Sequence, residues 1–452
     1  MDRIHAAHAL TPSGWVRDLR LSISDGRIVA LKAGIAAEPG DDRHTILLPG
    51  LPNLHSHAFQ RGMAGLAELR GASADNFWSW REVMYRFALT MTPDQVEAVA
   101  AQAYAEMLEA ALTRVGEFHY LHHGADGRPY ADIAEMAGRI GAAASETGIG
   151  LTLLPVFYAH GGFGGAVSGD GQRRFVNTVS QFERLLDASR RAVAGLSTAV
   201  VGVAPHSLRA VTAQELAAVT AMAGTTPVHI HVAEQVKEVE DCLAWSAQRP
   251  VEWLLDHAEI GGRWCLVHAT HMTGTETSRL AATGAIAGLC PITEANLGDG
   301  TFDGPAFAEA GGNWGIGTDS NVQIGAASEL RQLEYSQRLK LRARNVMAVA
   351  GGSTGRSLFD AALRGGPAAL GVGSAAIAAG APADFVSLDA NHAALAGRSD
   401  DQWLDSWIFA GAHGLVDCVW VAGQKLVEGG HHRHRAAIAK RFRQVMEDLR
   451  AV

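Results

Sequence analysis

The sequence predicts an α/β protein in which an eight-stranded (β/α)8 barrel of the TIM type carries a small β-sandwich module built from both chain ends. Apolar runs alternate with helical stretches through the middle of the chain, which is typical of parallel βα units. Short alternating strands with turns occupy both ends. The chain has 452 residues, 48% of them hydrophobic, enough for a barrel of roughly 250 residues or more and a second module.

The first 48 residues have the pattern of a small β module. Residues 15–23 alternate in polarity, residues 28–31 form a second apolar run, and Asp25-Gly26 lies between them. An Asp-Gly pair between two such runs is a strong hairpin signal. We therefore expect two antiparallel strands here.

Eight further apolar runs have the length of buried strands. They are residues 46–54, 115–120, 151–157, 199–205, 228–232, 264–269, 285–289 and 314–318. Helical patterns separate most of them, such as 92–112, which opens with Thr92-Pro93-Asp94, and 212–222. Eight such units suit a closed barrel, and an open doubly wound sheet is the alternative.

Strand patterns return after the barrel. Residues 380–389 and 419–427 predict short strands, and 436–449 predict an amphipathic helix. We expect these strands to join the N-terminal ones. The predicted division is 1–48 with 379–430 for the β-sandwich module, 49–378 for the barrel and 431–452 for a C-terminal helix.

The charge balance argues against nucleic acid as a partner. There are 38 Lys and Arg against 47 Asp and Glu, a formal net charge of −9, and no basic stripe is visible. Local arginines still allow a small anionic ligand.

Cysteine usage and hydropathy predict the compartment. The four cysteines, Cys242, Cys265, Cys290 and Cys418, have no C-x-x-C spacing, which indicates free thiols in a reducing compartment. The N-terminus has no signal-peptide pattern, and no apolar run is long enough to span a bilayer. We expect a cytoplasmic protein without membrane contact.

His55-Ser56-His57 ends the first barrel run. Residues i and i+2 of a strand point the same way, so both imidazoles can bind one metal ion, although the pair alone is as readily two ordinary histidines. Polar residues at other strand ends strengthen the metal interpretation, because barrel chemistry sits there. These residues are Glu117, His119, Tyr120, His206, Arg209, His231, Glu234, His268 and Asp319.

A mononuclear metal hydrolase explains this set best. His55, His57 and His231, with the Asp319 carboxylate, suit one Zn²⁺ that keeps a position for water. The metal lowers the pKa of that water towards ~7, which makes hydroxide available at neutral pH. Fe²⁺ and Mn²⁺ compete with Zn²⁺ for such nitrogen and oxygen ligands.

Three side chains are predicted to act on the reacting groups. Asp319 can take the proton of the water, although it can equally cap the next helix. Glu234, three residues after His231, can carry a proton to a leaving nitrogen. His268 can polarise the electrophile or stabilise the tetrahedral intermediate. His229 lies deeper on the same strand face, and we assign it to packing.

At these residues the sequence resembles the amidohydrolase superfamily, in its single-metal aminohydrolase branch. The resemblance lies in His-x-His on the first strand, His-x-x-Glu on the fifth, His on the sixth and Asp on the eighth, together with Gly-x-x-Ala-Asp-Phe-Val-x-Leu-Asp in the flanking module. It covers most of the chain, and it implies a homodimer.

Within this branch the sequence is most similar to the formimidoylglutamate deiminases of histidine degradation. The segments that carry this similarity are 54–61, 77–82, 117–120, 206–211 and 293–300. Purine and pyrimidine deaminases tend to carry Pro-x-Ser-Asn after the seventh strand, whereas here Pro291 is followed by Ile292-Thr293-Glu294. The resemblance implies that metal-activated water attacks the formimino carbon of N-formimino-L-glutamate, with release of ammonia and N-formyl-L-glutamate.

That substrate has two carboxylates. Arg81 and Arg209, with Tyr120 and His206, are predicted to bind them, since Arg forms bidentate pairs with carboxylates. Gln60 is predicted to contact the glutamate portion or the formimino group. Arg81 can instead pair with a neighbouring carboxylate or with solvent, and Arg209 can cap a loop.

The stretch 58–91 is long and rich in aromatic residues. We interpret it as a packed lid that presents Arg81, with plain hydrophobic packing as the alternative. The aromatic residues are Trp78, Trp80, Tyr85 and Phe87.

Two other functions stay open. An aminohydrolase of a heterocycle such as guanine, cytosine or a triazine would bind its substrate by aromatic stacking and amide contacts in place of paired arginines. A non-catalytic barrel scaffold is a more remote alternative, because such a protein would be expected to lose metal ligands, and here the full set is present.

Overall fold

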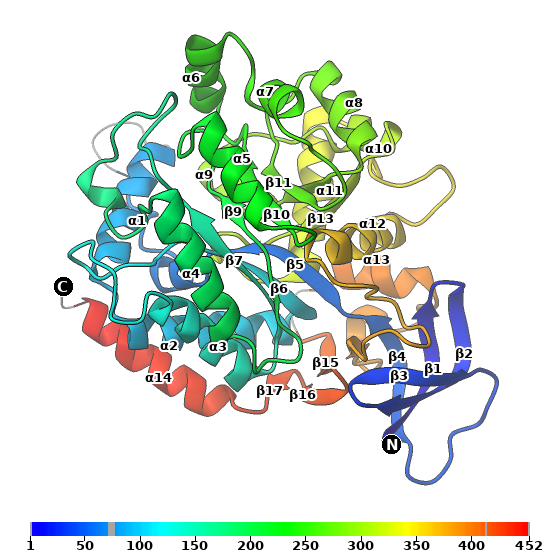
Figure 1. Cartoon of the computed structure of the whole chain (residues 1–452). Helices are drawn as coiled ribbons and strands as arrows, with labels where there is room; N and C mark the ends of the chain where they lie inside the picture. The colour runs from blue at the N-terminus through cyan, green and yellow to red at the C-terminus, as the bar shows by residue number, and fades with distance from the viewer. Residues whose placement is uncertain (1, 71–76, 412–413, 451–452) are drawn as a thin grey trace.

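The barrel and the β module of the predicted fold are both present in the computed structural model, which describes residues 2–70, 77–411 and 414–450 (Figure 1). Figure 1 shows the β module at one side of the barrel, with the N-terminal strands in blue beside the C-terminal strands in orange.

One eight-stranded sheet joins the two ends of the chain in a sandwich-like module. Its order is β17-β16-β15-β14-β4-β1-β2-β3. The strands are β1 (Asp2–Thr11), β2 (Gly14–Ser24), β3 (Arg27–Lys32), β4 (Asp42–Pro49), β14 (Phe385–Leu388), β15 (Val416–Val421), β16 (Gln424–Glu428) and β17 (His431–His432). Strand β4 pairs with β1 in parallel and with β14 antiparallel, so it connects the N-terminal strands to the C-terminal ones. The hairpin predicted around Asp25-Gly26 is confirmed as β2 and β3.

Two parallel sheets make up the barrel. They contain β5 (Leu51–Ser56), β6 (Leu112–His119), β7 (Gly150–Phe157), β8 (Val200–Val201), β9 (Ala204–Pro205), β10 (Val228–Val232), β11 (Trp264–His268), β12 (Ile286–Leu289) and β13 (Asn313–Ile316). Parallel bridges Val203–Val228 and Ser56–Asp319 join their edges. The strands therefore form a closed barrel, as predicted, and the alternative of an open doubly wound sheet is wrong.

Two of the predicted strand runs are wrong in extent. Residues 46–54 are not one strand, because the run divides at Gly50 between β4 of the module and β5 of the barrel. The Gly50 amide donates to Asp384 in the module, and the next amide, of Leu51, donates to Ala111 in the barrel. A Cβ at Gly50 would overlap the Thr113 side chain, so this change of sheet requires glycine. Residues 199–205 likewise form two short strands, β8 and β9.

Helices cover the outside of the barrel (Figure 1). They are α1 (Phe77–Thr90), α2 (Pro93–Glu109), α3 (Glu135–Thr147), α4 (Val179–Ala192), α5 (Ala213–Met222), α6 (Val236–Ser246), α7 (Pro250–His257), α8 (Gly274–Thr283), α9 (Pro291–Leu297), α10 (Gly304–Glu309), α11 (Ala326–Leu341), α12 (Thr354–Ala369), α13 (Asp401–Phe409) and α14 (Arg435–Arg450), with short 3-10 turns at η1 (Ala58–Met63), η2 (Asp170–Gln172) and η3 (Ala393–Leu395). Thr92 and Thr212 close capping boxes at the starts of α2 and α5, which confirms both predicted helix starts.

The C-terminal helix packs along α2 of the barrel. It begins at Arg435, while His431 and His432 still belong to the module sheet. The division into 1–48 with 379–430, 49–378 and 431–452 remains a prediction.

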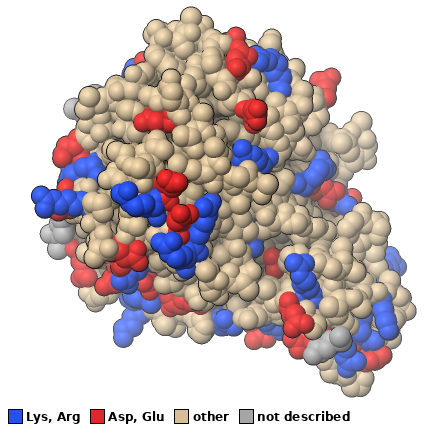
Figure 2. Space-filling view, in the orientation of Figure 1, with Lys and Arg blue, Asp and Glu red and all other residues tan. Residues whose placement is uncertain are grey.

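Charged residues of both signs are interspersed on the face of the molecule shown in Figure 2, where blue and red side chains lie next to each other. Among the helices within residues 2–70, 77–411 and 414–450, none is both long and apolar enough to cross a membrane.

Candidate metal-dependent active site

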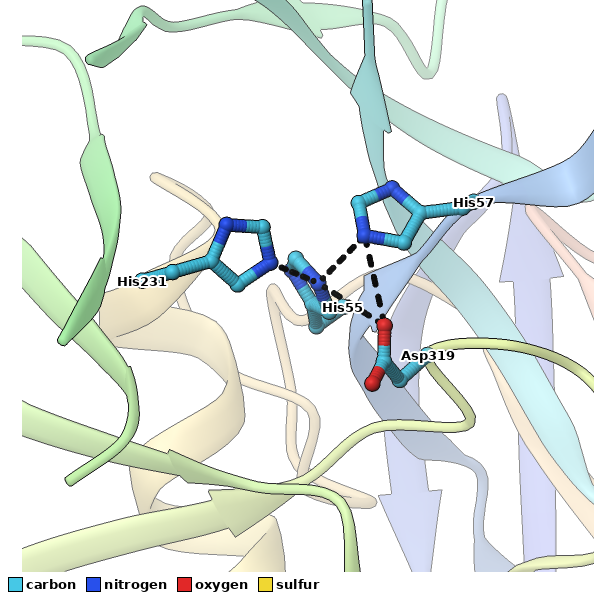
Figure 3. A group of neighbouring side chains, drawn as sticks. All are labelled: His55, His57, His231 and Asp319. Carbon is cyan, nitrogen blue, oxygen red and sulfur yellow. Dashed lines mark hydrogen bonds and ion pairs between the residues drawn. The ribbon is translucent and has the colours of Figure 1, made fainter. Parts of the chain in front are cut away.

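Four side chains from distant parts of the chain converge at the C-terminal end of the barrel. His55 and His57 come from the end of β5, His231 from β10, and Asp319 from the loop after β13 (Figure 3). The Nε2 atom of His55 lies 3.2 Å from that of His57 and 3.0 Å from that of His231. Asp319 Oδ1 lies 3.3 Å from Nε2 of both His55 and His57. The predicted ligand set is thus brought to one point.

Backbone carbonyls orient two of the three imidazoles. His57 Nδ1 lies 2.9 Å from the Phe118 carbonyl oxygen, and His231 Nδ1 lies 3.1 Å from the His206 carbonyl oxygen. A carbonyl only accepts, so Nδ1 of each ring carries the hydrogen. The Nε2 lone pairs therefore face the common point, as they do in metal-binding histidines.

Burial keeps these imidazoles neutral. It lowers the pKa of His55 to about 3, and it lowers the pKa of His57 and His231 as well. The Nε2 lone pairs of His57 and His231 and a carboxylate oxygen then meet where a neutral His55 can supply at most one hydrogen, which is unfavourable unless a cation lies among them. Three neutral imidazoles and one carboxylate are also a ligand set that a catalytic metal ion prefers. The residues present fit a metal ion.

The backbone holds Asp319 firmly against β5. Its amide donates to the His55 carbonyl oxygen and its carbonyl accepts the His57 amide, both at 2.9 Å. The Asn321 side-chain amide donates to the carbonyls of both His57 and Asp319 at 3.1 Å. Asp319 has φ 44°, a conformation that non-glycine residues adopt mainly under constraint. The alternative that Asp319 caps a helix is wrong, because the next helix, α11, has Gly325 at its N-cap.

Glu234 and His268 lie beside the ligand set. His268 Nε2 is 3.7 Å from Glu234 Oε1 and 3.8 Å from Asp319 Oδ2, and its Nδ1 is 3.3 Å from Glu294 Oε1. Burial raises the pKa of Glu234 to about 7, which is suitable for carrying a proton at neutral pH. Burial alone would lower the pKa of His268, but the carboxylates of Glu234, Glu294 and Asp319 raise it to about 10. His268 is also in the left-handed region, with φ 67°.

A pocket opens over this centre. All five predicted substrate-binding residues line it, namely Gln60, Arg81, Tyr120, His206 and Arg209. Gln60 Nε2 donates to Tyr120 Oη at 2.8 Å. The Arg209 guanidinium lies 4.0 Å from the carboxylates of Glu234 and Glu238. The structure thus places both arginines in the pocket that contains the metal ligands.

His229 does not line this pocket. It is fully buried, and its Nε2 lies 2.7 Å from the Ala369 carbonyl oxygen. This contact lies between β10 and the end of α12, which agrees with the predicted packing role.

The stretch 58–91 closes one side of the pocket through α1. Phe77, Trp80, Arg81 and Tyr85 of this helix line the pocket, and the Arg81 guanidinium lies 5.4 Å from the centre of the Tyr85 ring. Residues 71–76 and the Trp78 side chain lie outside the described part of the chain. That the stretch moves as a lid remains a prediction.

Several pocket residues were missed from the sequence. Tyr158 and Phe175 line the pocket, and the Tyr158 ring contacts the His206 ring with centroids 4.7 Å apart. Tyr158 directly follows β7, so the rule that barrel sites use strand ends would have found it. Phe175 comes from an irregular loop and carries no comparable signal. Glu294 and Asp299 lie beside His268 and do not line the pocket, and they belong to a segment that the sequence marks only by resemblance.

Comparisons with known proteins agree with this geometry. Residues 46–426 match the family model "Amidohydrolase family", and residues 1–45 match "Formimidoylglutamate deiminase HutF, N-terminal domain". The formimidoylglutamate deiminase of Pseudomonas aeruginosa is 48% identical over 99% of this chain and 100% of its own. The 8-oxoguanine deaminase of the same organism is 27% identical over 72% of this chain and 73% of its own.

Solved structures share the fold over the whole chain. An amidohydrolase from Brucella melitensis is 59% identical with a TM-score of 0.97, and the match covers 99% of this chain and 100% of that one. A zinc-bound adenosine deaminase from Xanthomonas campestris is 23% identical with a TM-score of 0.81 over 100% of this chain and 98% of its own. The chain therefore belongs to the amidohydrolase family, in the group that contains the formimidoylglutamate deiminases.

Proposed function

We propose that this protein hydrolyses N-formimino-L-glutamate to N-formyl-L-glutamate and ammonia. The observation that carries the proposal is that Arg81 and Arg209 line the same pocket as the metal ligands. Two guanidinium groups beside a hydrolytic centre match a substrate with two carboxylates. The full-length similarity to a formimidoylglutamate deiminase supports the same substrate.

We assign one Zn²⁺ to His55, His57, His231 and Asp319, with Fe²⁺ or Mn²⁺ as alternatives. When bound, the ion supplies a hydroxide nucleophile at neutral pH. The chain holds the ligands in position through the Phe118 and His206 carbonyls, so little reorganisation accompanies binding.

Three residues act on the reacting groups. Asp319 accepts the proton of the attacking water, and its burial beside the imidazoles keeps it close to that water. A new carbon–oxygen bond forms at the formimino carbon while Glu234 carries a proton to the terminal nitrogen. The proton that Asp319 took from the water then passes to the same nitrogen, the carbon–nitrogen bond breaks to release ammonia, and Glu234 recovers a proton from the new hydroxyl group. His268, held by Glu294 on its other side, stabilises the developing charge at that carbon.

Five residues orient the substrate. Arg81, Arg209, Tyr120 and His206 bind the two carboxylates, and Gln60 contacts the glutamate portion or the formimino group. Gln60 is already hydrogen-bonded to Tyr120, which keeps both groups in place for the substrate.

The identity of the product tests this proposal. Water attack on the formimino carbon can expel either nitrogen, giving N-formyl-L-glutamate with ammonia or L-glutamate with formamide. We expect N-formyl-L-glutamate and ammonia in equal amounts, measured by proton NMR of the reaction mixture. L-glutamate with formamide would contradict the assignment of Glu234 to the terminal nitrogen.

We propose a homodimer in the cytoplasm that acts on a small anionic substrate and binds neither nucleic acid nor membrane. The mass of the purified chain by light scattering tests the dimer, because a monomer mass at working concentration would contradict it.

A further inference from the structure

Outside the catalytic centre, His44, Asp417 and Cys418 form a second cluster of metal-binding side chains. One ligand atom from each lies within 4.8 Å of the other two. His44 Nδ1 is 3.9 Å from Asp417 Oδ2, and Cys418 Sγ is 3.4 Å from the same oxygen. Nitrogen, oxygen and sulfur ligands together suit a borderline-soft divalent ion such as Zn²⁺.

A β-bulge brings the two neighbouring ligands together. Ser387 pairs with Cys418 and Leu388 pairs with Val416, which leaves Asp417 as the extra residue of β15. In a regular strand, residues 417 and 418 would point to opposite faces of the sheet. The bulge turns the Asp417 carboxylate towards Cys418, as the contact between them shows.

The His44 ring is oriented with a lone pair towards Asp417. Its Nε2 lies 3.1 Å from Asp42 Oδ1, and a carboxylate accepts, so Nε2 carries the hydrogen. Nδ1 then faces the Asp417 carboxylate, whose Oδ2 also accepts from the Ser387 hydroxyl at 3.4 Å, and a cation between the two acceptors would be favourable. A carboxylate behind a histidine is also the usual support of a metal-binding imidazole.

Lys425 lies nearby but does not place its charge between His44 and Asp417. Lys425 Nζ lies 2.9 Å from Asp42 and 3.5 Å from Glu428. Among the ion pairs of the described residues, none joins Asp417 to a lysine or an arginine. The Asp417 side chain is 36% exposed, so an ion can reach the cluster from solvent.

We propose that His44, Asp417 and Cys418 bind a borderline-soft divalent cation of the Zn²⁺ class, separate from the catalytic metal. The thiol proton leaves to solvent as the metal–sulfur bond forms. His44 lies on β4 and the other two ligands lie on β15, so the ion ties the two ends of the chain together in the β module.

Cadmium titration of the full-length protein loaded with a single equivalent of Zn²⁺ per chain, enough for the catalytic ligands only, tests this site. Sulfur-to-cadmium charge transfer gives an ultraviolet band, and the four ligands assigned to the catalytic metal contain no sulfur. We expect one further equivalent of Cd²⁺ per chain, with the band reaching its endpoint at that equivalent while the zinc content stays constant. The absence of a band after several equivalents would overturn the proposal.

Variants of single residues identify the sulfur. Cys418→Ser is expected to abolish the band, and Cys242→Ser, a matched buried thiol elsewhere, is expected to retain it. Cys290 lies near His268 and Asp319, so a band that depends on Cys290 instead would overturn the proposal. Asp417→Asn, which keeps the shape of a half-exposed side chain, should lose the extra equivalent even if Cys418→Ser does not fold. Retention of that equivalent in Asp417→Asn would also overturn the proposal.

Discussion

Arg209 Nη2 lies 4.0 Å from Glu234 Oε2, so the guanidinium that we assign to a substrate carboxylate also faces the proposed proton carrier. Burial raises the pKa of Glu234, and the Arg209 charge works against that rise. Substrate binding and proton transfer are therefore coupled at this pair.

Replacement of Arg209 by Ala is expected to affect both steady-state constants. KM should rise roughly 10- to 150-fold, because hydrogen bonds to charged groups contribute about 1.5–3 kcal/mol, and kcat should fall as well because Glu234 loses a neighbouring cation. Initial rates of ammonia release over a range of substrate concentrations give both constants. An unchanged KM would contradict the assignment of Arg209 to a carboxylate.

Replacement of Arg81 by Ala is expected to raise KM by a similar roughly 10- to 150-fold with little change in kcat. Arg86→Ala, on the exposed side of the same helix, is the matched control and should leave both constants near the wild-type values. If Arg81→Ala behaves like Arg86→Ala, α1 covers the pocket only by packing.

Glu234→Gln is expected to lower kcat by about 10²- to 10⁴-fold, the usual contribution of a positioned acid–base group. The amide keeps the shape of the side chain but carries no transferable proton, so KM and the metal content should change little. Metal content by elemental analysis separates this result from loss of the ion. A kcat close to the wild-type value would mean that a residue other than Glu234 carries the proton.

Removal of the catalytic metal by dialysis against a chelator is expected to abolish ammonia release, and Zn²⁺ should restore it. His231→Ala should fail to regain activity and should contain less metal. His229→Ala, two residues earlier on β10, removes a buried imidazole that contacts Ala369 instead, so it should be less stable but keep its metal. Equal metal loss in both variants would contradict the ligand assignment.

Replacement of two helical glycines by Ala is expected to change the free energy of unfolding in opposite directions. A Cβ at Gly365 in α12 would overlap the Trp314 carbonyl of β13, so Gly365→Ala should destabilise the fold by about 1–3 kcal/mol. Gly138 in α3 has open space around it, and Gly138→Ala should stabilise the helix by roughly 0.5–1 kcal/mol. Urea unfolding measures both values. Destabilisation by Gly138→Ala would show that helix propensity does not determine the effect of this substitution on stability.

Much of the barrel follows from local patterns in the sequence. The segment 228–232 is predicted with its observed bounds, and all five of its residues are buried in the structure. The metal ligands are also predictable, since strand ends meet at one end of a barrel whatever the loops do. Gly50 shows the limit, because the run 46–54 is largely apolar and its tertiary partners, Asp384 and Ala111, divide it between two sheets.

The walls of the pocket were harder to predict. Phe175 reaches the site from an irregular loop that is held by contacts distant in sequence, such as those of the buried Arg174 with the carbonyls of Ala88 and Met91. Such loops have no periodicity to read. The same applies to the Asp417 bulge, because the extra residue is visible only against the paired strand β14.

Substrate choice is the most direct test of the central claim. Ammonia release by the zinc-loaded protein should be measured with N-formimino-L-glutamate, guanine and cytosine at equal concentrations. The account predicts strong turnover of N-formimino-L-glutamate alone, because only that substrate offers two carboxylates to Arg81 and Arg209. Turnover of a heterocycle without turnover of N-formimino-L-glutamate would contradict the proposed function. It would still agree with the assignment of the metal ligands.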